Sequence, residues 1–93
     1  MSDTFAADTI AGRLAGHPGW AYDGESLVRV FDRRDFNGSI AFVNAVAQAA
    51  NQLDHHPDLA LSWNEVTVRT WSHDAGGITE RDFALIAAID RLT

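Results

Sequence analysis

The first fifteen residues of the chain place apolar side chains at a helical spacing. This pattern predicts a short helix over residues 3–15, and Asp3 or Thr4 could cap its first turn. Gly16 and Pro18 should end the helix, because glycine adopts the left-handed backbone that follows many helices and proline cannot continue one.

Strand-like residues follow on both sides of a turn signal. Residues 20–22 and 27–31 are rich in aromatic and β-branched side chains, which favours two short strands. Asp23-Gly24 between them predicts a tight hairpin turn, because both central positions of the favoured hairpin turn need positive φ. Residues 20–31 are therefore predicted to form a β-hairpin.

The longest apolar pattern predicts a helix that begins at Asp35 or Asn37 and runs to about Leu53. Pro57 disfavours helical geometry at His56, so the helix should end at or before that residue. A wide apolar face indicates packing on a sheet and on a second subunit. Its members are Ile40, Val43, Ala47 and Ala50, flanked by Phe36, Phe42, Val46 and Ala49.

Alternation over residues 59–63 and 65–72 predicts two more strands with a tight connection. The last helix should run to about Leu92. It opens with a capping box, in which Thr79 and Asp82 satisfy backbone N–H groups reciprocally.

These elements predict an α+β fold in the order α-β-β-α-β-β-α, with a four-stranded antiparallel sheet and three helices packed on one face. A chain of 93 residues is expected to be one domain, residues 1–93. A domain this small gains stability from assembly into oligomers.

Composition excludes several classes of function. The chain has no cysteine, so disulfides, zinc-thiolate sites and a thiol nucleophile are excluded, and a cytosolic (cytoplasmic) location fits. The net charge is −6 with seven Lys and Arg, which argues against direct nucleic-acid binding. No apolar run is long enough to span a membrane.

The candidate chemistry is concentrated around His55 and His56, just after the long helix. Histidine gives and accepts protons near neutral pH, and His73 and Asp82 lie downstream where they could return to the pair. Simpler explanations stand beside this one. The histidine pair could be a solvated loop, and the capping box alone explains Asp82. Trp63 suits core or interface packing. A metal site is disfavoured, because adjacent histidines point apart and no H-x-H or H-x-x-x-H spacing occurs.

The spacing of these residues resembles the signature of the pterin-4a-carbinolamine dehydratase family. The resemblance covers roughly residues 10–92 and includes the start of the middle helix and the turn into the last one. The signature begins with Asp54-His55-His56-Pro57. Trp63 follows after five residues, His73 after nine more and Asp82 after eight more. The segments Asp35-Phe36-Asn37 and Gly77-Ile78-Thr79-Glu80-Arg81-Asp82 also match.

This resemblance implies dehydration of 4a-hydroxytetrahydropterin (4a-hydroxytetrahydrobiopterin) to quinonoid dihydropterin, without metal or organic cofactor, in the recycling used by aromatic amino-acid hydroxylases. It implies that His55 and His73 transfer protons and that His56 contacts the substrate. Asp54 and Asp82 would orient the imidazoles. Which histidine is the acid and which the base stays open.

The resemblance also suggests that Trp63, Ser72 and Asn51 contact the substrate, and that the chain forms a homodimer or homotetramer. Two positions depart from the family's pattern. Asn51 stands where most members carry an acidic residue, and Leu59 stands where many carry an aromatic one. An amide cannot supply negative charge, so slower turnover is expected.

Two alternatives remain beside the active dehydratase. The first is a catalytically weakened pterin-binding module, or a dimerisation or scaffold module, which Asn51 and the apolar middle helix motivate. The second is a metal-dependent enzyme that uses the histidines.

Overall fold

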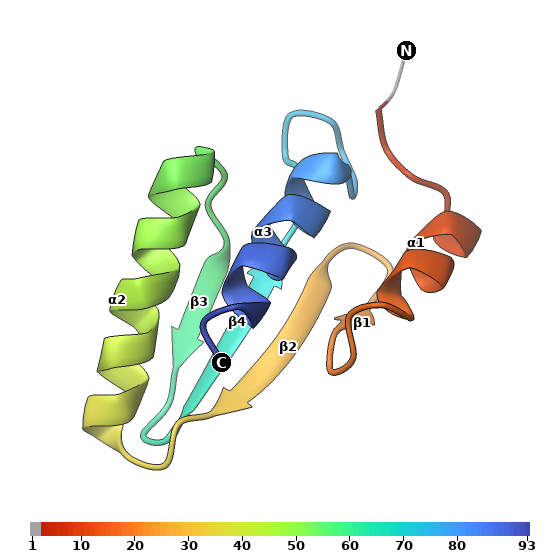
Figure 1. Cartoon of the computed structure of the whole chain (residues 1–93). Coiled ribbons are helices and arrows are strands. Elements are labelled where there is room, and N and C mark those ends of the chain that lie inside the picture. Colours follow the sequence, from red (N-terminus) through yellow and green to blue (C-terminus); the bar gives the residue numbers. More distant parts are fainter. Residues whose placement is uncertain (1–2) are drawn as a thin grey trace.

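The computed structural model describes residues 3–93 and shows three helices and four strands in the predicted order (Figure 1). The antiparallel four-stranded sheet confirms the predicted fold class. The elements are α1 (Ala7–Leu14), β1 (Ala21–Tyr22), β2 (Leu27–Asp32), α2 (Phe36–Leu53), β3 (Asp58–Leu61), β4 (Glu65–Thr70) and α3 (Glu80–Asp90).

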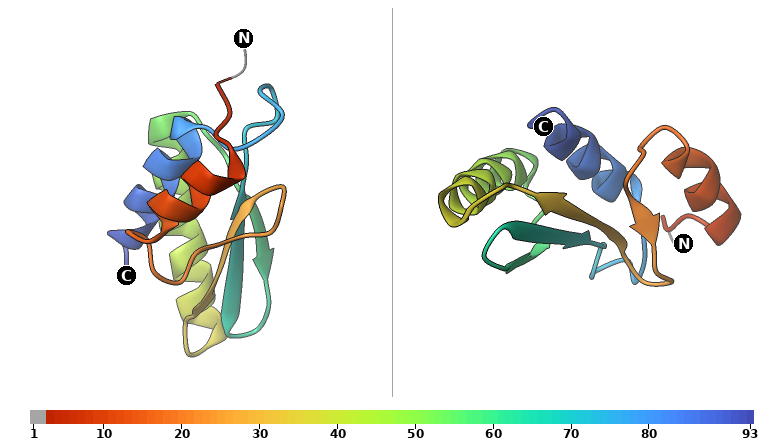
Figure 2. Two further views of the ribbon diagram at one scale, coloured as in Figure 1. Left: turned by 90° about the vertical axis from the view of Figure 1, so that its right-hand side faces the viewer. Right: turned by 90° about the horizontal axis from the view of Figure 1, so that it is seen from below.

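The strands lie in the order β1-β2-β4-β3, so the two hairpins meet through β2 and β4 at the centre of the sheet. In this register Phe31 of β2 lies opposite Val66 of β4, and Leu59 of β3 lies opposite Val68. All three helices lie on the same side of the sheet, with α2 and α3 side by side and α1 near β1 (Figure 2). The edge strand β3 begins close to the end of α2, which places the histidine pair at this edge.

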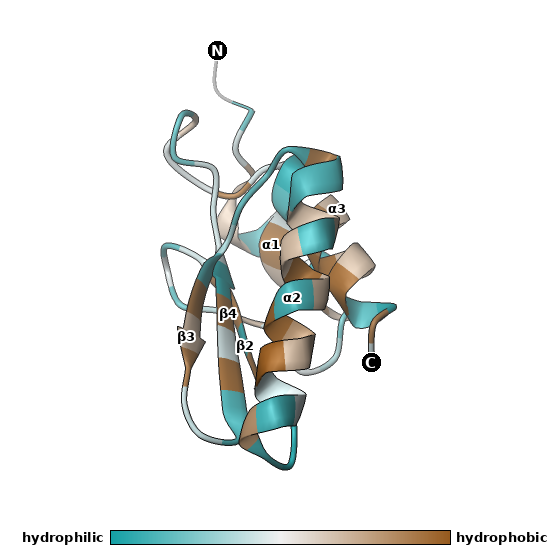
Figure 3. Cartoon of the chain, turned by 90° about the vertical axis from the view of Figure 1, so that its left-hand side faces the viewer, coloured by the Kyte–Doolittle hydropathy of each residue, from teal (hydrophilic) through white to brown (hydrophobic). Residues whose placement is uncertain are grey.

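The helix α2 buries only part of the wide apolar face predicted for it. Phe42, Val46 and Ala50 lie in the core with Ser39, at spacings of three and four residues. Ile40 remains 38% exposed and Phe36 50% exposed, so part of the wide apolar face is not covered by the sheet (Figure 3). Within residues 3–93, no helix is both long and apolar enough to cross a membrane.

The first helix is shorter than predicted. It covers Ala7–Leu14, and no side chain caps its first turn, so Asp3 and Thr4 do not serve as caps. The reason is a tertiary contact, because the N–H of Phe5 donates to the carbonyl of Ile78 and holds the preceding chain extended. The prediction rested on local pattern, which contains no information on this contact.

The first hairpin has a longer loop than the predicted two-residue turn. Only Gly24 adopts positive φ there, at 96°, and four residues separate the strands. The carboxylate of Asp23 accepts the N–H groups of Glu25 and Ser26. The Ser26 hydrogen bond, followed by that of Glu25, lowers the pKa of Asp23 to about 2. Side-chain hydrogen bonds therefore stabilise this loop, and it is not the tight turn with positive φ at both central positions that was predicted.

The later strands also end earlier than predicted. β3 stops at Leu61 and β4 at Thr70, so Trp63 lies in the loop between them. Ser72 lies beyond β4 and forms an isolated bridge with Gly77. This bridge leads the chain into α3.

A polar cluster around Asp90 joins the N-terminal part of the fold to the C-terminal end of α3. The carboxylate of Asp90 accepts the indole N–H of Trp20 at 2.7 Å and a guanidinium N–H of Arg29 at 3.1 Å. The ring of His17 lies 3.2 Å from the same carboxylate. His17 therefore has a structural contact at the C-terminal end of α3.

Candidate active site

The end of α2 turns the chain back and delivers His55 to a buried position. Asp54 adopts a left-handed backbone with φ of 51°, which aspartate tolerates better than most residues. The N–H groups of Asp54 and His55 then both donate to the carbonyl of Ala50, as in a Schellman motif. Pro57 follows and prevents the helix from continuing. His55 is consequently only 8% exposed.

Asp82 lies in the first turn of α3 and is completely buried. Its Oδ2 accepts the backbone N–H of Thr79 at 3.0 Å, which confirms the predicted capping box. Its Oδ1 lies 2.7 Å from Nε2 of His55. The helix N-terminus favours a negative charge at this point. The capping role and the pairing with histidine are therefore both present in one carboxylate.

Hydroxyl groups complete the surroundings of this carboxylate. Thr70 donates to Oδ1 of Asp82 at 2.7 Å, and Ser72 donates to Oδ2 at 2.8 Å. The hydroxyls of Ser72 and Thr79 lie 2.8 Å apart. Ser72 was expected to contact substrate, but it is fully buried and its hydroxyl is bound within this network. In this structure the hydroxyl of Ser72 therefore binds Asp82, which in turn contacts His55, and the contact of Ser72 with substrate stays a prediction.

Sequence reasoning did not include Thr70, and it assigned Thr79 only a capping role. The sequence does contain a signal for Thr70, because Thr70 and Ser72 stand two apart and so point to the same face of an extended chain. That face is the buried one, as Val66 and Val68 show. Two hydroxyls in line with a buried strand face indicate a buried polar partner.

His56 points to a different place from His55. It is exposed, and its Nε2 lies 2.9 Å from the side-chain oxygen of Asn51 in the last turn of α2. The adjacent histidines thus have separate partners, one buried carboxylate and one exposed amide. Asn51 therefore contacts His56, and its contact with substrate stays a prediction.

The third histidine, His73, is exposed and lies against Trp71, with ring centroids 4.2 Å apart and an interplanar angle of 33°. It follows β4 and the Ser72–Gly77 bridge, in the loop that precedes α3. His73 and Ser72 are adjacent along the chain, yet one is exposed and the other buried. Among residues 3–93, no hydrogen bond links His73 to His55 or to Asp82.

Two predicted site residues lie apart from the buried pair. Asp54 is exposed, and within the described residues its carboxylate makes no hydrogen bond. Trp63 is 67% exposed, and its carbonyl accepts the hydroxyl of Ser39 near the start of α2, at 3.3 Å. His55 follows the opposite end of this 18-residue helix, which is about 27 Å long. One chain therefore does not bring Trp63 together with the histidines.

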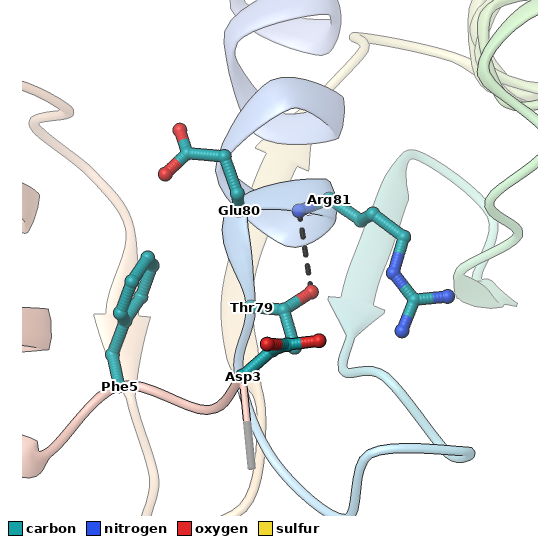
Figure 4. A pocket seen from close by; sticks show the side chains of 5 residues that line it. All are labelled: Asp3, Phe5, Thr79, Glu80 and Arg81. Atoms are coloured by element: carbon teal, nitrogen blue, oxygen red, sulfur yellow. Dashed lines mark hydrogen bonds between the residues drawn. The ribbon is translucent and has the colours of Figure 1, made fainter. Parts of the chain in front are cut away.

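Two hollows lie near the network. One, of about 360 Å³, opens at the start of α3, and the hydroxyl of Thr79 inside it accepts the N–H of Arg81 (Figure 4). Its lining residues are Asp3, Phe5, Thr79, Glu80 and Arg81. The other, of about 280 Å³, is lined by Tyr22, Gly24, Glu25, Trp71, Gly76 and Gly77. Thr79 lines the first hollow and is hydrogen-bonded to Asp82. Trp71 lines the second hollow and contacts the ring of His73.

Potential metal ligands do not converge in the part of the chain that the structure describes. Over residues 3–93, no three side chains of histidine, aspartate or glutamate are placed so that they could hold an ion together. The contacts of His55 and His56 with different partners are consistent with this arrangement.

Comparison with known proteins places this geometry in a family. The family model described as "Pterin 4 alpha carbinolamine dehydratase" matches residues 3–92. The chain belongs to this family. A relative from Thermosynechococcus vestitus, named "Putative pterin-4-alpha-carbinolamine dehydratase", is 46% identical over 92 residues, which are 99% of this chain and 97% of the relative. A relative of the same name from Natronomonas pharaonis is 37% identical over 99% of this chain and 98% of its own.

Solved structures agree with the fold of the carbinolamine dehydratase family. The "transcriptional coactivator/pterin dehydratase from Brucella Melitensis" superposes with a TM-score of 0.89 at 28% identity, over 96% of this chain and 97% of that chain. A "pterin dehydratase-like protein" identified as a RuBisCO assembly factor of the alpha-carboxysome superposes with a TM-score of 0.68 at 23% identity, over 82% and 90%. Family membership supports a dehydratase, and the second structure shows that the fold also occurs in an assembly factor.

The buried carboxylate leads to a first prediction. The substitution Asp82→Asn should lower the free energy of unfolding by about 3–5 kcal/mol, because an amide cannot accept all the donors around it and leaves buried groups unpaired. Urea unfolding followed by tryptophan fluorescence measures the change. Asp74→Asn, which removes an exposed partner of Arg81, is the matched control and should change stability little. Equal, small losses in both variants would contradict the role assigned to Asp82.

Proposed function

We propose that this protein dehydrates 4a-hydroxytetrahydropterin to quinonoid dihydropterin by histidine acid–base catalysis. The observation that carries the proposal is the His55–Asp82 pair, in which a buried carboxylate orients an imidazole at the edge of the sheet. An imidazole held in this way by a carboxylate serves as a proton-transfer group in other enzymes. Family membership supports the same reaction class.

The reaction needs only proton transfers. The C4a–OH bond breaks and a C4a=N5 double bond forms, while the proton on N5 is lost, so the products are dihydropterin and water. Hydroxide is a poor leaving group, and a general acid must therefore protonate it. A base must accept the N5 proton. Each well-placed group of this kind contributes about 10²–10⁴-fold to the rate.

In this proposal, His55 and His73 are the proton-transfer groups and His56 contacts the substrate, supported by Asn51. Asp82 orients His55, and Asp54 is assigned the same role toward the neighbouring ring. His73, exposed beside Trp71, is free to turn toward a ligand. The proposed chemistry uses no metal ion and no organic cofactor.

The wider setting is also part of the proposal. The quinonoid dihydropterin becomes tetrahydropterin only after a separate reduction, and the dehydration is one step in the recycling used by aromatic amino-acid hydroxylases. We also propose a cytoplasmic homodimer or homotetramer. Support for assembly comes from the apolar side chains that the chain leaves uncovered. Phe36 and Ile40 are exposed on α2, and Leu61 and Trp63 are exposed where the start of this helix meets the β3–β4 loop. In an oligomer, Trp63 of a second copy could approach the histidines.

A second candidate function is a pterin-binding or scaffold module with little turnover. Asn51 favours it, because an amide beside His56 cannot provide the negative charge that an acidic residue would. One of the two solved structures is described as a transcriptional coactivator as well as a pterin dehydratase, and the other as an assembly factor, so scaffold roles are known for proteins of this fold. This candidate predicts pterin binding without acceleration of the dehydration.

Turnover tests the proposed function. The protein should accelerate the dehydration of freshly generated 4a-hydroxytetrahydropterin above the rate in buffer. His55→Ala should remove about 10²-fold or more of that acceleration, since it deletes a proton-transfer group. His17→Ala is the matched control, because it removes a histidine from the distant Asp90 cluster. A folded native protein with no acceleration would refute the dehydratase, and equal rates in both variants would refute the site.

The Asn51 position leads to a separate prediction. Asn51→Glu should raise kcat by about 3- to 10-fold, because a carboxylate strengthens the hydrogen bond to His56 and stabilises its protonated ring. Gln52→Glu adds the same charge at the neighbouring exposed position of α2 and should leave kcat nearly unchanged. An equal response to both substitutions would show that general charge, and not the contact with His56, sets the rate.

A further inference from the structure

Three hydrogen bonds of fixed direction reach the carboxylate of Asp82, and a fourth contact joins it to His55. Oδ1 accepts from the hydroxyl of Thr70 and lies 2.7 Å from Nε2 of His55. Oδ2 accepts from the hydroxyl of Ser72 and the backbone N–H of Thr79. An ionised carboxylate offers about four lone-pair sites, two on each oxygen. Donors occupy three of these sites and, with the N-terminus of α3, stabilise the ionised carboxylate, so we expect Asp82 to be an acceptor toward His55 as well.

The hydroxyl groups in this network have defined directions. Ser72 has one hydroxyl proton, and it is directed to Asp82. The contact between Ser72 and Thr79 must then use the proton of Thr79. The oxygen of Thr79 in turn accepts the N–H of Arg81 at 3.2 Å (Figure 4). A chain of donors therefore runs from the first turn of α3 through Thr79 and Ser72 to Asp82.

These directions determine the protonation of the His55 ring. Because an ionised Asp82 has no proton to donate, Nε2 of His55 must carry the hydrogen in their 2.7 Å contact. The other ring nitrogen, Nδ1, has no hydrogen-bond partner among residues 3–93. Every buried side-chain nitrogen or oxygen in the described chain has a partner. Nδ1 must therefore reach the surface of the protein.

We infer that Thr70, Ser72 and Thr79 are positioning residues, which keep Asp82 an acceptor and hold His55 as the Nε2–H tautomer with Nδ1 as its proton-exchanging atom. The catalytic part of this inference rests on the proposed function, whereas the tautomer follows from the hydrogen bonds alone. The three hydroxyl residues act on His55 through Asp82, and Ser72 and Thr70 lie too deep to touch a ligand themselves.

Nitrogen NMR tests the tautomer directly. In protein labelled with ¹⁵N at histidine, the neutral ring of His55 should show a protonated Nε2 and an unprotonated Nδ1. The His55→Ala variant assigns the signals by their loss. A protonated Nδ1 in the native protein would overturn the inference. This outcome does not depend on any activity.

Variants of the hydroxyl network provide the second test. Thr70→Val keeps the shape of the side chain but removes a hydrogen bond that stabilises the ionised carboxylate, so that the proton between Asp82 and Nε2 of His55 moves toward Oδ1 of Asp82. The variant should therefore contain the Nδ1–H tautomer, and Ser72→Ala should behave alike. Thr70→Ser restores the donor and should restore the native spectrum. Ser39→Ala removes a buried hydroxyl at the other end of α2 and is the matched control.

Kinetics on the same proteins complete the experiment. Thr70→Val and Ser72→Ala should lower kcat by about 10-fold with little change in KM, less than the roughly 10²–10⁴-fold contribution of an acid or base itself. Thr70→Ser should recover most of the loss. Folded variants that keep the native tautomer and the native kcat would overturn the positioning role. The predicted tautomer in a native protein without turnover would refute the proposed function alone.

Discussion

The burial of one carboxylate constrains the rest of this structure. A buried charge costs several kcal/mol unless hydrogen bonds replace its water. Asp82 meets this requirement with donors from the end of α2, from the end of β4 and its extension, and from its own helix cap. Each of these segments must end at the right place for the donors to meet. The Schellman turn after α2, the Ser72–Gly77 bridge and the capping box of α3 are the local structures that satisfy this condition.

The same network connects stability to chemistry. The carboxylate that completes the α3 cap also fixes one ring nitrogen of His55, and the other nitrogen reaches the surface. The exposed pair of His56 and Asn51 lies outside this buried core, and so does His73, whose ring is tilted against Trp71. Exposed side chains such as these can change conformation without unfolding the core. In the proposed reaction, a rigid imidazole thus works beside two mobile ones. This division suits a substrate whose acid and base steps occur at neighbouring atoms, C4a and N5.

Local sequence signals predicted the fold well, because helix caps, proline and strand alternation act within a few residues. The caps at Asp35 and Thr79 and the end of α2 before Pro57 are confirmed. Predictions failed where a contact between residues far apart in the sequence determines where an element begins. The start of α1 is an example, because the hydrogen bond from Phe5 to Ile78 holds the chain before it extended. The Asp82–His55 distance and the burial of Ser72 likewise depend on how α2, β4 and α3 pack. The family resemblance implied that Trp63 contacts the substrate, but the hairpin carries this residue to the opposite end of α2 from the histidine pair.

A crystal structure with a stable oxidised pterin, a ligand that cannot react, tests most directly whether His55 exchanges a proton with the substrate. If it does, the C4a–N5 edge of the ring lies within about 3–3.5 Å of Nδ1 of His55, a reactive distance. His56 and His73 should contact the same ligand, while Nε2 of His55 keeps its bond to Asp82. A pterin bound away from His55, for example against the exposed Trp63 of the same chain, would contradict the account.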